Sequence, residues 1–595
     1  MPSFKIGINM AGAISAGAYT AGVLDFLTEA LDEWYAAKKR GEAVPMHDIT
    51  IEVFAGASAG GMCAAISSVM LYQNFEHIHD VNQRNTSNIF YESWVNKIDI
   101  VPLLKTDDLS PGAPVISLLN SRIIDLIAAY ALKPTGLPPV FRPYVSPTLT
   151  LFLSLTNLRG VPYSLNGAAP GSIEETTFFY GDRIRFQTIS NGSATLTSAS
   201  TRTLDLSKPG PAGGWDVLQT AAMATGAFPV FLAPRILDRK LEEYIPPGWE
   251  SVVSAVTGTP PPIPPDIPPA DANPYQTLNV DGGVTNNDPF NYAHDYLLSL
   301  DPPVVGGKAL QDPTTVDRAV IGIAPFPTTD AFDPKFNAKR ASAVISALPK
   351  LFDALIAQAR FFGESLSAIM NGVTFDRFVI APSDDQLAVR YRSADPSQQP
   401  PALQCATLGA FGGFFHRGFR AHDYALGRRN CQKFLRDYFV LPADNAILKP
   451  ALDGLDAATR AAVLEKFRRP APGKYGEPEA AIARAGGMLP AVQRNAGRDW
   501  LPLVPLCGSA AVEAPHPARD KISALDVNRI VRLISKRLSK LGRVIASGVE
   551  DAGLRLFLLP GPFFISWLAK PKIKRAIING LGDSYASNSQ PSPSQ

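Results

Sequence analysis

A serine flanked by glycines lies near the start of the chain, in the segment Gly56-Ala57-Ser58-Ala59-Gly60. The G-x-S-x-G spacing is that of a nucleophile elbow, where a sharp strand-to-helix turn exposes the serine hydroxyl. Such a turn needs very small residues on both sides of the serine, and Gly56 and Gly60 supply them. A helix N-terminus at Ser58 would favour a developing negative charge. The pattern indicates nucleophilic acyl chemistry, although an ordinary glycine-rich turn fits the bare spacing too.

A carboxylate that could act as a base is Asp281, which Gly282 and Gly283 follow directly. It comes after the apolar segment 277–280, which we expect to be a strand. A carboxylate at the carboxyl end of a strand, before two glycines, lies on a loop that a substrate can approach. The alternative is a turn aspartate that closes a hairpin, because Asp-Gly is a common turn signal.

Oxyanion donors are expected in the small-residue loop 10–17, which links a predicted strand at 4–9 to a predicted helix at 18–39. A loop of this kind exposes backbone N–H groups, as an oxyanion hole requires. A dinucleotide-binding loop is a weaker alternative, because Gly7, Gly12 and Gly17 do not fit G-x-G-x-x-G. A purely structural turn also remains open.

Strands and helices that would position these residues follow from composition and periodicity. A strand at 50–54 and a helix at 62–71 flank the elbow. Further predicted strands cover 148–155, 178–188, 318–325 and 375–381, and further helices cover 215–226, 414–439 and 526–547.

Bulk composition describes an ordinary globular protein, with 46% hydrophobic and 18% charged residues. The net charge of +2 gives no reason to expect a nucleic acid partner. The four cysteines are far apart and form no C-x-x-C pair, which argues against a zinc site and against a disulfide scaffold.

Together the motifs resemble those of the patatin-like phospholipase family. The resemblance is carried by the ordered combination of a small-residue loop after the first strand, G-x-S-x-G about 45 residues later, and D-G-G after a late strand. Two more segments match: 224–231 (ATGAFPVF) resembles the family's S/A-x-A-x-P segment, and 281–289 (DGGVTNNDP) resembles its D-G-G-x-x-N-N-x-P. These matches span residues 4 to 325.

A serine–aspartate dyad without histidine is what the resemblance implies. Ser58 would be the nucleophile and Asp281 the base, with N–H groups around Gly12, Ala13 and Ile14 binding the oxyanion. The family's usual G-G-G-x-R-G loop reads Gly12-Ala13-Ile14-Ser15-Ala16-Gly17 here, so Ala16 replaces the customary arginine. The implied substrate is a phospholipid or lysophospholipid ester, and this chemistry requires no metal or cofactor.

The implied fold is a three-layer α/β/α core with a mixed, mainly parallel sheet and a helical C-terminal extension. We expect a catalytic domain at 1–385, with a proline-rich insertion at about 234–276, and a mainly helical region at 386–595. In that region an amphipathic, basic segment at 526–575 either lies on a membrane surface or packs on the main domain.

Alternatives to the serine–aspartate enzyme come from other classes. An α/β-hydrolase would need His294, His416 or His422, and it normally has several strands before its elbow, whereas we expect one here. A malonyl-transacylase-like enzyme usually has histidine at the position of Ala57. A catalytically silent lipid-binding or storage relative also remains open.

Localisation is expected to be cytoplasmic or peripheral to a membrane. The apolar run 6–27 is interrupted by Asn9 and several glycines and ends in an amphipathic pattern. This favours a strand–loop–helix unit over a cleavable signal peptide. No stretch reaches the length of a clean transmembrane helix.

Overall fold

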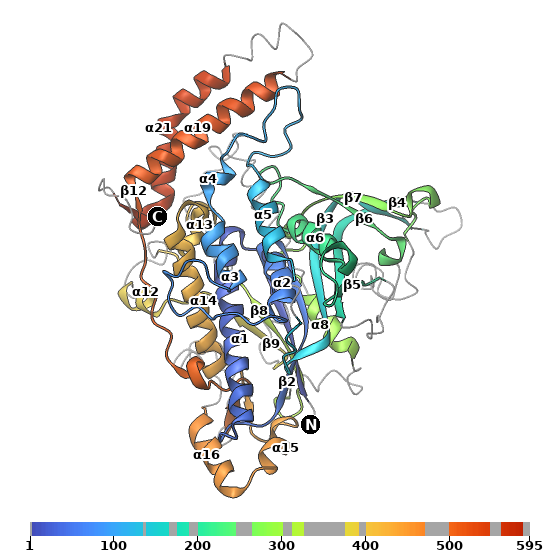
Figure 1. The fold of residues 1–595 in the computed structure, drawn as a ribbon, viewed down its shortest axis with the longest axis vertical. Helices are drawn as coiled ribbons and strands as arrows, with labels where there is room; N and C mark the ends of the chain where they lie inside the picture. Colours follow the sequence, from blue (N-terminus) through green and yellow to red (C-terminus); the bar gives the residue numbers. More distant parts are fainter. Residues whose placement is uncertain are drawn as a thin grey trace.

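A mixed sheet lies at the centre of the molecule (Figure 1). The computed structural model describes residues 3–134, 138–165, 175–189, 200–244, 265–300, 312–325, 375–391, 400–469, 499–547 and 561–586. Among these residues, nine strands form the sheet: β1 (Ser3–Met10), β2 (Asp48–Gly56), β3 (Val145–Leu165), β4 (Glu175–Ile189), β5 (Arg202–Asp205), β6 (Arg235–Arg239), β7 (Tyr275–Asp281), β8 (Arg318–Ile323) and β9 (Arg377–Ile380).

The main path of the sheet runs β5-β4-β3-β2-β1-β8-β9. Its pairs are parallel except for β3 with β4. Off this path, β7 pairs antiparallel with both β3 and β6. The carboxyl ends of β1 and β2 therefore meet at one edge, and β7 ends beside β3.

Helices cover both faces of the sheet. Phe54 of β2 belongs to the large core that also contains α1 (Gly17–Lys39), α2 (Ser58–Met70) and α6 (Trp215–Thr225). Its neighbours Val53 and Ala55 pack on the other face with α8 (Phe290–Leu300). This alternation of side chains along one strand places the sheet between two helical layers. The predicted three-layer α/β/α fold with a mainly parallel sheet is confirmed.

The remaining helices flank the helical layer that contains α1 or extend beyond it. Those before residue 385 are α3 (Ile89–Tyr91), α4 (Ile100–Leu103) and α5 (Arg122–Ala131). Those after it are α12 (Asp385–Arg390), α13 (Gly412–Phe415), α14 (Arg417–Asp437), α15 (Leu448–Asp453), α16 (Ala457–Phe467), α19 (Ala524–Ser547) and α21 (Gly561–Leu581). Two small sheets pair β10 (Val440–Pro442) with β11 (Trp500–Pro502), and β12 (Ile522–Ser523) with β13 (Tyr585–Ala586).

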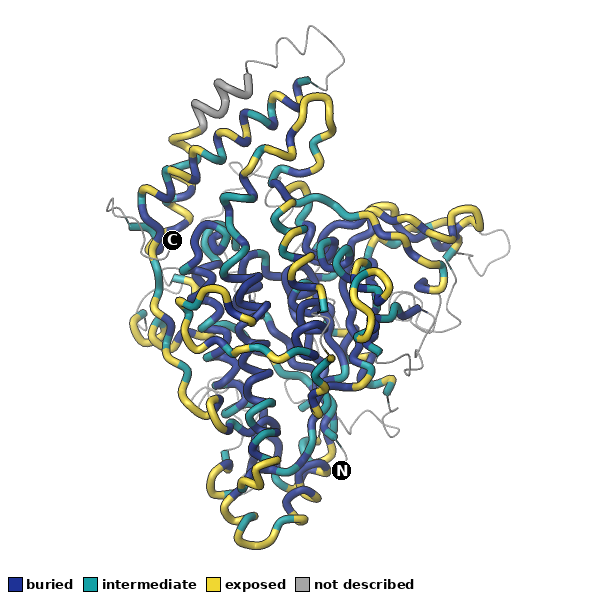
Figure 2. The backbone as a smooth tube through the Cα atoms, viewed as in Figure 1, coloured by how far each residue is buried: buried dark blue, intermediate teal, exposed yellow. Residues whose placement is uncertain are grey.

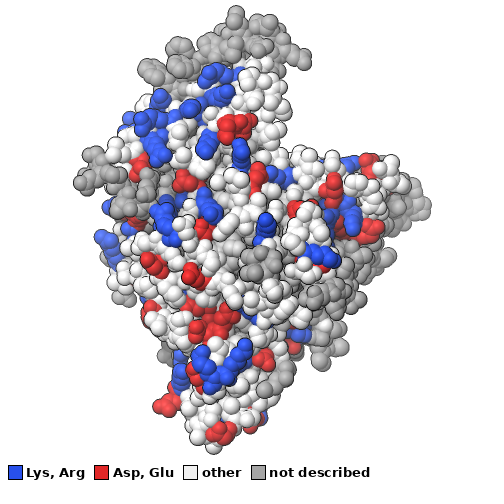
Figure 3. Space-filling model, viewed as in Figure 1, with Lys and Arg blue, Asp and Glu red and all other residues white. Residues whose placement is uncertain are grey.

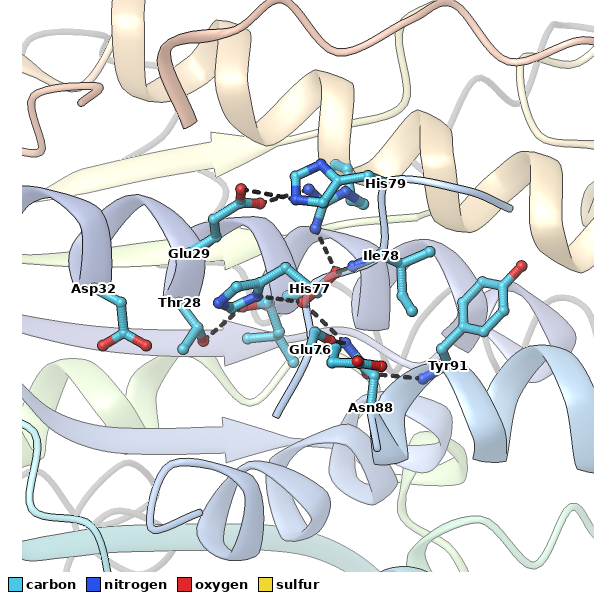
Figure 4. A network of polar contacts seen from close by, with 12 residues as sticks. Thr28, Glu29, Asp32, Glu76, His77, Ile78, His79, Asn88 and Tyr91 are labelled. Carbon is cyan, nitrogen blue, oxygen red and sulfur yellow. Dashed lines mark hydrogen bonds and ion pairs between the residues drawn. The ribbon is translucent and has the colours of Figure 1, made fainter. Parts of the chain in front are cut away.

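Helix α1 is buried along most of its length, which Figure 2 shows as a dark blue segment near the centre. Helix α14 packs along it and contributes Arg428, which forms ion pairs with Asp25 and with Glu29, the latter at 2.5 Å. The segment 76–88 packs against Asp25 and Glu29. In Figure 4, His79 points toward Glu29, and Asn88 donates to the carbonyl oxygen of Glu76.

Charge compensation in this cluster sets the pKa of Asp25. Burial alone would raise it, but Arg428 and the hydrogen bond from His77 lower it to about 2. Helices α1 and α14 come from opposite sides of residue 385, yet they share one core. The proposed domain boundary at 385 stays a prediction.

The C-terminal helix pair, α19 and α21, lies at one end of the molecule (Figure 1). The apolar stripe of α19 is buried at Val527, Ile530 and Leu541, and α19 also contacts α4. Within the described residues, no helix combines the length and the apolar composition needed to cross a bilayer.

Most predicted elements lie where the sequence placed them, with ends shifted by at most four residues, but β3 continues ten residues beyond its predicted end at 155. The strands β5 and β6 were not expected. Strand β6 lies inside the range that we expected as an insertion, and it pairs with β7. Within the region 386–595, which we expected to be mainly helical, residues 392–399, 470–498, 548–560 and 587–595 lie outside the described residues.

Candidate active site

Ser58 occupies the turn between β2 and α2, as the elbow pattern predicts. Its φ of +53° is in the left-handed region, which non-glycine residues adopt only at an energetic cost. Residues with such strained backbone angles are concentrated at functional sites. The flanking glycines permit the turn. A Cβ atom on Gly56 would lie 2.6 Å from the carbonyl oxygen of Gly60, and one on Gly60 would lie 2.7 Å from the carbonyl carbon of Met10. Any larger residue would force this turn open.

Asp281 is the last residue of β7, where it pairs with Leu155 of β3. The Thr156 hydroxyl donates to its carbonyl oxygen at 2.9 Å, and its own N–H donates to the carbonyl of Ala227 at 3.0 Å. Gly282 and Gly283 begin the short helical turn η6 (Gly282–Val284), and the Gly283 N–H donates to Asp281 Oδ1 at 2.7 Å. The Gly283 N–H thereby fixes the Oδ1 atom of Asp281, and the Oδ2 atom has a different partner.

The second carboxylate oxygen of Asp281 accepts a hydrogen bond from Ser58 Oγ at 2.6 Å. Both side chains are buried, with residue exposures of 7% for Ser58 and 3% for Asp281. Burial raises the pKa of Asp281, the hydrogen bonds from Ser58 and Gly283 partly offset this rise, and the net result is a pKa of about 7. A carboxylate with this pKa can take up a proton near neutral pH, as a general base must.

The predicted oxyanion loop lies beside Ser58. The N–H of Gly12 already donates to the carbonyl of Asn287 at 3.0 Å, whereas the described residues offer no hydrogen-bond acceptor to the N–H groups of Ala13 and Ile14. A Cβ atom on Gly12 would lie 3.0 Å from that of Ser58, so the loop and the elbow are adjacent. Ile14 has a φ of +48°, a strained value for a β-branched residue.

Hydrogen bonds of Ser15 hold the predicted oxyanion loop against the segment 410–413. Ser15 accepts a bond from the Gly413 N–H at 3.1 Å and donates its own hydroxyl and N–H to the carbonyl of Ala410. Ala16, at the position of the family's customary arginine, is fully buried. The described loop therefore supplies backbone donors and no cation at that point.

Thr225 and Asn287 are site residues that the motif analysis did not single out. The Thr225 hydroxyl accepts from the Ser58 N–H at 3.0 Å and donates to the Ser154 carbonyl at 2.7 Å. Both residues lie in the two segments that resemble family motifs, 224–231 and 281–289. Their position in these segments is the feature of the sequence that could have identified them. Nothing in the residue types themselves marks a buried threonine on a helix as part of a site.

A cavity begins at Ser58 and is otherwise almost entirely apolar. Its empty volume is about 910 Å³, open water at its mouth included. It lies among α2, α5, α6 and α13, and its wall includes Ile14, Met62, Ile124, Phe228 and Phe411. An apolar space that begins at a nucleophile suits a long acyl chain. The contribution of Phe411 and its neighbour Phe414 was not expected from sequence.

Histidines do not take part in this arrangement. Those required by an α/β-hydrolase triad have other partners: His294 contacts Asp376 at 3.3 Å, His416 contacts Asp520 at 3.6 Å, and His422 contacts Asp423 at 2.7 Å. In the described structure none of the chain's histidines bonds Ser58 or Asp281 or lines the cavity.

Comparisons with known proteins agree with the order of these motifs. The model of a family described as patatin-like phospholipase matches residues 9–294. A Sinorhizobium fredii protein, described as uncharacterized protein y4iI, is 32% identical over 601 residues, which cover 94% of this chain and 79% of that protein. Among solved structures, VipD from Legionella pneumophila overlaps 97% of this chain and 90% of its own. The sequence identity is 11% and the TM-score is 0.23.

Proposed function

The chain belongs to the patatin-like phospholipase family, and from that premise we propose that it hydrolyses acyl esters of phospholipids or lysophospholipids through Ser58 and Asp281. The observation that carries the proposal is the 2.6 Å hydrogen bond between Ser58 Oγ and Asp281 Oδ2 at the end of an apolar cavity. Family membership supports hydrolysis of lipid acyl esters as the reaction. The geometry of the site supports Ser58 and Asp281 as the residues that carry it out.

The first step is attack of Ser58 Oγ on the ester carbonyl, while Asp281 takes the serine proton. The N–H groups of Ala13 and Ile14 would bind the oxyanion, with help from the N-terminal end of α2. The Gly12 N–H is occupied by the Asn287 carbonyl, so we assign Gly12 the role of leaving space for the Asn287 side chain and for Ser58.

Collapse of the tetrahedral intermediate breaks the ester bond, and Asp281 returns the proton to the departing alcohol. The acyl group is then bonded to Ser58 Oγ. Water, deprotonated by Asp281, attacks the acyl-enzyme carbonyl; the bond between the acyl carbon and Ser58 Oγ then breaks, Asp281 returns the proton to Ser58 Oγ, and the fatty acid leaves. The pKa of Asp281 near 7 suits both directions of proton transfer.

The substrate's acyl chain would occupy the cavity between α5 and α13, and its head group would stay outside. Because such a chain must leave a lipid phase to enter, we further propose that the protein acts at a membrane surface. The proposal requires no metal or cofactor.

A fluorophosphonate label tests the nucleophile. Wild type should be labelled, and Ser58→Ala should not; equal labelling of Ser58→Ala would exclude Ser58. Hydrolysis of a panel of phospholipids and lysophospholipids should fall by several orders of magnitude in Asp281→Asn. His294→Ala is the matched control, and it should retain activity. Loss of activity in His294→Ala with retention in Asp281→Asn would favour a histidine-dependent triad instead.

A further inference from the structure

The C-terminal helix pair presents a row of cations, which are exposed except for the half-buried Lys540 and Lys574. On α19 they recur every three or four positions and so fall on one face of the helix. They are Arg529, Arg532, Lys536, Lys540 and Arg543, and α21 adds Lys570, Lys572, Lys574 and Arg575. Figure 3 shows Lys and Arg side chains gathered over these two helices. We call these nine residues the basic face.

Acidic side chains do not neutralise the basic face. In the described part of the chain none of its nine cations forms an ion pair. The nearby acids have other partners: Asp108 binds the buried Arg537 at 2.8 Å, Asp107 lies 3.7 Å from Arg122, and Asp526 accepts from Ser523. The basic face is therefore a local field of one sign on a chain whose net charge is only +2.

Helix α19 is joined to the wall of the cavity through Arg537. This side chain donates to the carbonyl of Leu118, and the Leu118 N–H donates to the carbonyl of Val230 at 2.9 Å. The next pair, Leu119 and Phe231, is bonded in the same way and lines the cavity. On the other helix, the Gly580 carbonyl accepts from the Leu408 N–H, three residues before Phe411. Both helices of the pair thus contact segments that form the cavity wall.

Exposed apolar side chains lie on these same segments. We call Ile116, Leu126 and Val230 the apolar rim; their exposures are 59%, 58% and 61%. Val230 also has a φ of +70°, which is strained for a β-branched residue. Its side chain packs little in return for that strain, and such outliers point to function.

We propose that the basic face and the apolar rim together dock on a bilayer that contains anionic lipid, with the cavity mouth against the lipid. Charge of one sign beside exposed apolar residues is the combination that binds such a surface, since lipid phosphates attract the cations and the acyl region accepts the rim. A nucleic acid would use the cations but leave the rim in water. The inference rests on the proposed function, because it explains how an acyl chain reaches Ser58.

Vesicle co-sedimentation tests the basic face. Wild type should bind vesicles of phosphatidylcholine with one quarter phosphatidylglycerol at least tenfold more tightly than vesicles of phosphatidylcholine alone. The triple variant Arg529→Gln, Lys536→Gln, Arg543→Gln should bind the anionic vesicles about 100-fold more weakly, since each cation near the surface contributes a factor of about five. The matched control is Lys39→Gln, Arg460→Gln, Lys466→Gln, which removes three exposed cations at the α16 end of the molecule and should bind as wild type.

Val230→Asp tests the rim, with Val389→Asp as its control because Val389 is also an exposed valine but lies on α12. Val230→Asp should weaken vesicle binding about tenfold, and Val389→Asp should not. All variants should hydrolyse soluble p-nitrophenyl butyrate at the wild-type rate, which also shows that they are folded.

Several results would overturn the docking proposal. They are equal binding of wild type to both kinds of vesicle, unchanged binding by the triple variant, or binding to RNA instead of vesicles. Failure of the fluorophosphonate to label Ser58, with lipid-charge-dependent binding intact, would refute the proposed function and leave the docking surface standing.

Discussion

The hydroxyl of Thr225 accepts a hydrogen bond from the backbone N–H of Ser58 at 3.0 Å, although the two residues are 167 positions apart. The same hydroxyl donates to the carbonyl of Ser154 on β3. One side chain on α6 therefore ties the elbow to the strand beside which Asp281 lies.

Thr225→Val should lower kcat about tenfold with little change in KM, because it leaves the Ser58 N–H without its partner and lets the nucleophile shift. It should also lower the free energy of unfolding by about 1–3 kcal/mol, since two buried polar groups lose a bond. Thr225→Ser should restore both quantities. Thr220→Val, on the exposed side of the same helix, is the matched control. Steady-state kinetics and urea denaturation measure the two effects.

Activity should depend on the ionisation of Asp281. Because a base acts when deprotonated and burial raises its pKa to about 7, kcat/KM for a soluble ester should be constant above pH 7 and fall about tenfold per pH unit below it. The pKa of His294 is also raised, because its acidic neighbours outweigh the effect of burial. Its titration would produce a similar fall of kcat/KM. The pH profile of kcat/KM for His294→Ala should therefore match that of wild type. If the fall below pH 7 were absent in that variant, the titration would belong to the histidine.

The acyl cavity should set chain-length preference. Ala128→Phe places a large side chain in the cavity wall on α5. Hydrolysis of long-chain esters should fall at least tenfold, whereas that of an acetyl ester should change less than twofold. Ala129→Phe, one residue along and exposed, should leave both rates unchanged. An equal loss for short and long esters would contradict binding of the acyl chain in this cavity.

Arg428 should contribute strongly to stability. Arg428→Met leaves Asp25 and Glu29 buried without their cation and should lower the free energy of unfolding by about 3–5 kcal/mol at pH 7. The lowered pKa of Asp25 stabilises the fold above its ordinary pKa near 4, and this contribution is lost as pH falls toward 2. The difference between wild type and variant should therefore shrink as pH falls. Arg460→Met breaks only an exposed pair with Asp453 and should cost less than about 1 kcal/mol in urea denaturation.

Elements with strong local signals could be predicted from the sequence, and those whose existence depends on a distant partner could not. The apolar run in β3 and the amphipathic stripe of α19 carry their own periodicity. Strand β6, with the sequence RILDR, is short and largely polar, and pairing with β7 makes it a strand.

The candidate site shows the same division. Ser58 and Asp281 have distinctive neighbours in the sequence, so motifs identified them, and the structure adds their 2.6 Å contact. Thr225 and Phe411 are ordinary residues of a helix and a loop, and only the folded chain brings them to Ser58 and the cavity. Which N–H groups are unoccupied in the loop at 12–14 likewise depends on Asn287.

The pairing of Asp25 with Arg428 also has a consequence for synthesis on the ribosome. The two residues are separated by 403 positions. At about 5–20 residues per second, the arginine emerges roughly 20–80 s after the aspartate. Throughout that interval the two carboxylates of the nascent N-terminal helix lack this arginine, so we expect the final packing of the helix to wait until α14 has been translated.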